Sequence, residues 1–94
     1  MKDDKFKAMV AISVEVVLMR KGGPQYQLVL ARLERDYDCK IIDCYHHPEY
    51  LRAVLIDVYG KDYPRILESL EAELGEIIDE KEIIAFLGVL NRVK

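Results

Sequence analysis

The chain of 94 residues contains no tryptophan, three prolines and only two cysteines, Cys39 and Cys44. Two cysteines so close together cannot form the disulfide framework that stabilises small secreted domains. The first residues mix acidic and basic side chains and lack the pattern of a secretory signal. We therefore expect a cytoplasmic protein whose two thiols are reduced.

Long uncharged runs are also missing. Charged residues make up 33% of the chain and recur throughout it, so no run approaches the roughly 18 apolar residues of a membrane-spanning helix. The hydrophobic fraction of 51% is too high for a disordered chain. The sequence predicts one soluble globular domain over residues 1–94, with no membrane partner.

The chain also lacks clusters of basic residues and phosphate-binding loops. The net charge is −3, and lysines and arginines are interspersed with acidic residues. Phosphate neutralisation supplies most non-specific affinity for nucleic acid, so we expect no nucleic-acid partner. The run Lys21-Gly22-Gly23 lacks the further glycine and the following lysine of a phosphate-binding loop. We therefore expect no cofactor.

The chain does contain glycines and prolines at the positions where helices are expected to end and begin. Gly22, Gly60 and Gly75 each follow an apolar-periodic run, while Pro24 and Pro48 each open the next. The apolar positions between these breaks recur at helical spacing. They are Tyr26, Val29, Leu30, Leu33 and Tyr37; Leu51, Val54, Leu55 and Val58; Tyr63, Ile66, Leu67, Leu70 and Leu74; and Ile83, Phe86, Leu87 and Leu90. The pattern predicts an all-α bundle of five or six short helices.

A rival fold uses the same segments differently. If 8–19, 39–47, 50–59 and 82–92 were strands, their order with the two helices would be the ferredoxin-like βαββαβ. The run His46-His47-Pro48-Glu49 makes a poor hairpin turn. Helix caps are also expected at Asp62 and in the Asp79–Glu82 capping box. We favour the all-α fold, and leave residues 38–47 undecided between helical turns and a strand.

The first predicted helix is unusually apolar. From Phe6 to Met19 its polar positions form one narrow arc, and such a helix must be covered on several sides. A chain this short is not expected to cover it alone. We therefore predict a two-fold symmetric homodimer. The residues assigned to its interface are Phe6, Met9, Val10 and Val17.

Chemically capable side chains gather in only one segment, within eleven residues. They are Cys39, Asp43, Cys44, His46, His47 and Glu49. Structural zinc sites use paired ligands with a second pair farther along the chain, and no second pair exists here. A thiolate nucleophile needs a base and an orienting third group, and no such group can be named. We predict no catalytic or metal-binding residue, with a metal- or thiol-dependent sensor or enzyme centred on Cys39–Glu49 as the alternative.

Three of the six tyrosines lie off the clearest apolar stripes. We expect Tyr45, Tyr50 and Tyr59 to line a surface groove and contact a protein partner, because aromatic side chains supply much of the energy at interface centres.

The stretch from Tyr37 to Gly60 contains Asp43-Cys44-Tyr45, His47-Pro48-Glu49-Tyr50-Leu51 and Val58-Tyr59-Gly60. It resembles small helical archaeal domains that stand alone or form output modules of signalling proteins. The likeness continues through Leu74-Gly75-Glu76 and Phe86-Leu87-Gly88-Val89-Leu90, over most of residues 24–92. The resemblance implies an all-α module without established catalytic residues. The predicted function is therefore a non-enzymatic interaction or regulatory module.

Overall fold

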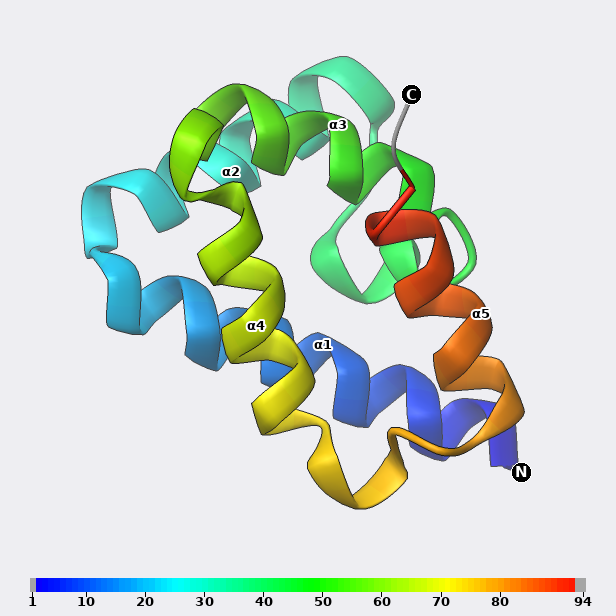
Figure 1. Cartoon of the computed structure of the whole chain (residues 1–94). Coiled ribbons are helices and arrows are strands. Elements are labelled where there is room, and N and C mark those ends of the chain that lie inside the picture. Colours follow the sequence, from blue (N-terminus) through cyan, green and yellow to red (C-terminus); the bar gives the residue numbers. More distant parts are fainter. Residues whose placement is uncertain (1, 93–94) are drawn as a thin grey trace.

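A computed structural model describes residues 2–92 and is helical along most of that range (Figure 1). The α-helices are α1 (Lys2–Lys21), α2 (Gly23–Tyr37), α3 (Pro48–Tyr59), α4 (Tyr63–Glu73) and α5 (Lys81–Leu90), and the 3-10 turns are η1 (Ile41–Tyr45), η2 (Gly60–Asp62) and η3 (Gly75–Ile77). Residues 2–92 contain no strand. The all-α prediction is confirmed, and the ferredoxin-like alternative is wrong. The undecided segment 38–47 contains a 3-10 turn.

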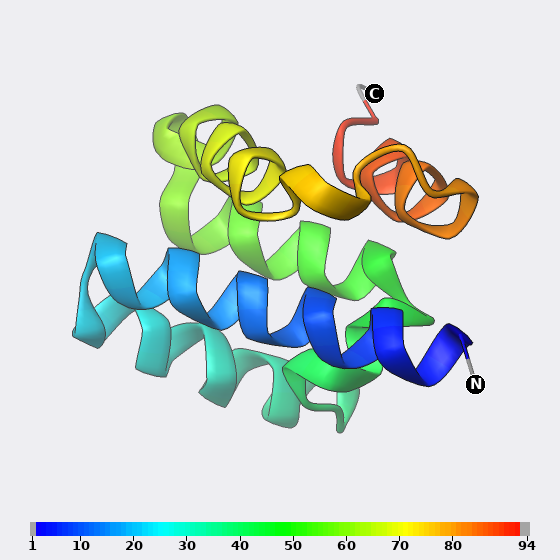
Figure 2. The ribbon, with the colours of Figure 1, turned by 90° about the horizontal axis from the view of Figure 1, so that it is seen from below.

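The helices stack in layers. Helices α4 and α5 lie across α1 and α3, and α2 lies on the opposite side of that pair (Figures 1 and 2). Contacts between elements agree with this order, since α1 packs against η1, α2 and α4, while α3 packs against α2 and α5. The layers therefore cover α1 on two opposite sides with other segments of the same chain.

Glycine and proline break the helices where the sequence places them. Gly22 has φ 144° between α1 and α2, and Gly60 has φ 52° at the end of α3. These backbone conformations are costly for any residue with a Cβ atom. Pro24 and Pro48 lie in the first turns of α2 and α3. No sequence pattern predicted the conformation of Asp38, a non-glycine residue in the left-handed region at φ 52°, which ends α2.

One of the two predicted helix caps has the right position and the other is wrong. Asp62 is the N-cap residue of α4, as expected, but its side chain makes no capping hydrogen bond, and the residue lies inside η2, which leads directly into α4. Asp79 lies one residue too early, since α5 begins at Lys81 and Glu80 precedes it. The carbonyl of Glu80 instead accepts the backbone N–H of Ile84 at 2.9 Å.

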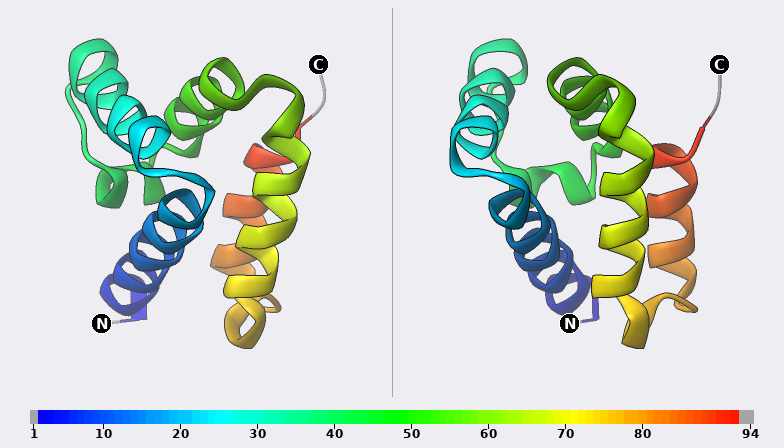
Figure 3. Two further views of the ribbon diagram at one scale, coloured as in Figure 1. Left: turned by 90° about the vertical axis from the view of Figure 1, so that its left-hand side faces the viewer. Right: turned by 60° about the vertical axis from the view of Figure 1, so that its left-hand side comes forward.

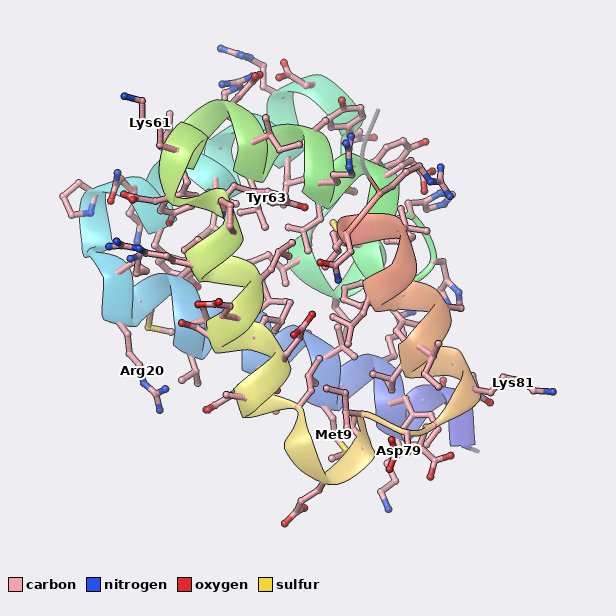
Figure 4. All side chains as sticks on the ribbon, in the orientation of Figure 1. Met9, Arg20, Lys61, Tyr63, Asp79 and Lys81 are labelled. Carbon is pink, nitrogen blue, oxygen red and sulfur yellow. The ribbon has the colours of Figure 1, made fainter. Side chains whose placement is uncertain are left out.

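The core takes in one face of α1. Phe6, Val10 and Val17 are each at most 3% exposed within the single chain. Met9 is partly buried and lies beside the η3 segment (Figure 4). The assignment of Phe6, Val10 and Val17 to a dimer interface is therefore corrected, because they are buried within the single chain. The assignment of Met9 stays a prediction.

Candidate interaction surface

The cysteine-rich segment folds around its own backbone. After the left-handed turn at Asp38, the N–H of Lys40 donates to Asp43 Oδ2 at 2.9 Å and starts η1. The thiol of Cys44 donates to the carbonyl of Lys40 at 3.6 Å. Both Cys39 and Cys44 are buried. The Asp43 carboxylate and the Cys44 thiol thus serve the turn itself.

Burial also sets the chemistry of the two thiols. It raises the pKa of Cys44 far above its ordinary value, and the neighbouring Cys39 raises it further. Burial likewise raises the pKa of Cys39. Since the thiolate is the nucleophile and the metal ligand, both sulfurs are held in their unreactive form.

The histidines of the same segment are exposed, and both line one shallow hollow together with Cys39 and Asp43. His46 and His47 are exposed, and His47 Nδ1 lies 3.5 Å from Glu49 Oε2. Within residues 2–92, no three histidine, cysteine, aspartate or glutamate side chains converge closely enough to hold a metal ion. The cluster is compact in sequence, and in the fold its two thiols are buried while its two imidazoles are exposed.

The three predicted partner-binding tyrosines do not form one surface. Tyr59 is only 6% exposed and belongs to the core, so its assignment to a partner surface is wrong. Tyr50 is partly buried and stacks on Tyr37 and on His47, with ring centroids 4.4 Å and 4.8 Å apart. Tyr45 is partly buried, with its ring 6.3 Å from that of Phe86. All three rings pack within the chain.

A hollow with a volume of about 480 Å³ lies among α3, α4 and α5. Two of its polar side chains bond to backbone near the end of α5. Tyr63 donates its hydroxyl to the Leu90 carbonyl at 2.7 Å, and Arg52 Nη2 donates to the Arg92 carbonyl at 2.7 Å. Arg52 Nε is buried and has no hydrogen-bond partner among the described residues. Burial raises the pKa of Tyr63 to about 12. These two bonds secure the end of α5.

An open groove lined by exposed apolar side chains lies between α1, α2 and η1, with a volume of about 530 Å³. We call it the α1 groove. The residues lining it are Ala8, Ala11, Ile12, Glu15, Leu30, Glu34, Cys39, Lys40, Ile41 and Ile42. Because the side chains of Ala8 and Ala11 are small, space remains beside them, and the short η1 turn does not fill it. Two of its lining residues are exposed large apolar side chains, Ile12 at 60% and Ile42 at 40%.

Among residues 4–92, three further large apolar side chains are exposed, namely Met19, Leu28 and Ile84, and none of them lines the α1 groove. The sequence did not predict this groove. The available signal was the pair Ala8 and Ile12, one helical turn apart on α1. The groove could not be found from the periodicity alone, because η1 forms one of its walls.

No helix in the described range is both long enough and apolar enough to cross a bilayer. Comparison of the chain with protein-family models, with curated proteins and with solved structures gives no match.

Proposed function

We propose that this chain is a non-enzymatic protein-interaction module of a regulatory or adaptor kind, and that it binds its partner in the α1 groove. The observation that carries the proposal is the exposure of Ile12 and Ile42 on one hollow. Contiguous exposed apolar surface with a polar rim is typical of interaction sites. Covering what is exposed of these two side chains contributes on the order of 2–3 kcal/mol to binding.

The shape of the groove favours a helical partner. Its long wall is α1, and apolar grooves beside a helix accept an amphipathic helix through side chains one turn apart. The rim carries Glu15, Glu34 and Lys40, which supply both signs of charge for orienting that partner. The proposal places the module in the cytoplasm, where its buried thiols stay reduced.

A thiol- or metal-dependent function has weaker support. The raised pKa of Cys39 and Cys44 keeps both sulfurs protonated, which suits neither nucleophilic attack nor metal binding. Glu49 lies beside His47, at 3.5 Å from Nδ1, but that pair has no thiolate to activate while both thiols stay protonated.

Site-specific photo-crosslinking tests the proposal. A photoreactive residue at position 42, on the groove, is compared with one at position 84, where Ile84 is exposed to a similar extent outside it. We expect discrete crosslinked protein products from position 42 that disappear when Ile12 is replaced by Asp. Equal product patterns from both positions, or products that survive the Ile12→Asp change, would contradict the function.

A further inference from the structure

We propose that the occupant of the α1 groove is a second copy of this chain, with the two α1 helices packed antiparallel about a two-fold axis level with residue 10. This inference rests on the proposed function and names the partner. It uses a face of α1 other than the one assigned from the sequence, since Phe6, Val10 and Val17 are buried. The new face carries Lys5, Ala8, Ile12 and Glu15.

The spacing of these four residues is symmetric. They follow one another at intervals of three, four and three residues, so the pattern is the same from either end. Around the axis of an α-helix these four residues lie within an arc of about 80°, so they share one face. A two-fold axis midway along this face sets Ala8 opposite the partner subunit's Ile12. It also sets Lys5 opposite the partner subunit's Glu15.

The charges are self-complementary in this arrangement. Lys5 is exposed at one end of the face, and Glu15 is half-buried at the other. The hydroxyl of Tyr26 donates to Glu15 Oε2 at 3.4 Å and helps to fix that carboxylate at the rim. The two-fold axis brings each lysine to the opposite glutamate, so two opposite-charge pairs form at once. A parallel arrangement would instead set like charges side by side.

The shapes match in the same way. Ile12 protrudes, being 60% exposed, while the small side chains of Ala8 and Ala11 leave the hollow beside it. A two-fold symmetric dimer needs a protruding side chain and a hollow on the same surface, because the symmetry places each Ile12 in the hollow of the other subunit. The groove is open to a second α1 helix, since the layer formed by α4 and α5 covers a different side of α1 (Figure 3).

Sedimentation velocity over a concentration series measures the association directly. We expect a concentration-dependent equilibrium between the 10.9 kDa chain and a species of twice that mass. Ile12→Asp places two carboxylates in the apolar contact and is expected to weaken the dimer by more than about 100-fold. The matched control is Ile84→Asp, at a side chain 57% exposed outside the groove, which should leave the dimerisation constant unchanged.

Charge exchange tests the antiparallel pairing itself. Lys5→Glu alone, or Glu15→Lys alone, converts both opposite-charge pairs into like-charge pairs and should weaken the dimer by about tenfold or more. The double variant restores both pairs in reversed order and should return to within about threefold of the original affinity. Tyr26→Phe removes the hydroxyl that bonds Glu15 without changing any charge, and controls for that lost bond.

Different results would contradict the symmetric dimer and the interaction module. A chain that stays monomeric at every concentration, or a double variant no better than the single ones, overturns the symmetric dimer. If the crosslinker at position 42 then captures a different protein in an Ile12-dependent manner, the interaction module survives with a foreign partner. If the chain is monomeric and position 42 captures nothing beyond the control at position 84, both fail. Circular dichroism of each variant shows that the fold is retained.

Discussion

Two tyrosines with opposite surroundings allow the hydrogen bonding of this fold to be tested. The Tyr63 hydroxyl donates to the Leu90 carbonyl at 2.7 Å, and Leu90 is the last residue of α5 (Figure 4 marks Tyr63). Carbonyls in the last turn of a helix have no N–H partner within that helix. The Tyr59 hydroxyl is buried, and among residues 2–92 it has no hydrogen-bond partner. The same deletion of one oxygen should therefore have different effects at the two positions.

Tyr63→Phe is expected to lower the free energy of unfolding by about 1 kcal/mol. A net hydrogen bond contributes roughly 0.5–1.5 kcal/mol, and partial burial of this one lets water replace part of what is lost. Tyr59→Phe removes a hydroxyl whose desolvation nothing offsets, so stability should stay the same or rise by up to about 1 kcal/mol. The two variants should thus differ by about 1–2 kcal/mol.

Urea denaturation followed by helical circular dichroism measures both values, and an unchanged slope shows that the denatured state is comparable. For a domain of this size, 1 kcal/mol corresponds to about 4–8 °C in melting temperature, so thermal melts provide a second reading. Each variant is the other's control, because both exchange tyrosine for phenylalanine. Equal destabilisation by Tyr59→Phe and Tyr63→Phe would refute the hydrogen-bond assignment.

Two further predictions concern protons. The pKa of Tyr63 is raised by burial from 10.0 to about 12, so between those pH values the unfolded chain releases a proton that the folded chain holds. The contribution of Tyr63 to stability should therefore be constant below about pH 10 and be lost as the pH rises toward 12, and Tyr63→Phe should make the fall over that range less steep in urea titrations. The second prediction is that Cys39 and Cys44, buried and with raised pKa, react with a thiol-specific disulfide reagent much more slowly in the native chain than in urea. A native thiol reacting at the unfolded rate would show that the buried assignment is wrong.

The candidate site was less predictable than the helices for a physical reason. Ile12 and Ala8 carry the groove, but nothing local distinguishes them from Val10 or Val17 on the same helix. Which face of α1 stays open depends on where η1, α2 and α4 pack against it. The homodimer expectation depended on the helix being too apolar for its own chain, and the chain buries the face that carries Phe6, Val10 and Val17. The face that carries Ile12 stays open.

Sequence alone determined the positions of the helices and their breaks, because helical periodicity and the backbone limits of glycine and proline act within a few residues. Gly22, Gly60, Pro24 and Pro48 mark these breaks as expected. Tertiary structure alone decided that Tyr59 is buried, that the thiols of one segment are buried while its histidines are exposed, and that a groove lies beside Ile12. Burial is set by neighbours distant along the chain, and no local pattern specifies which of several apolar faces those neighbours will cover.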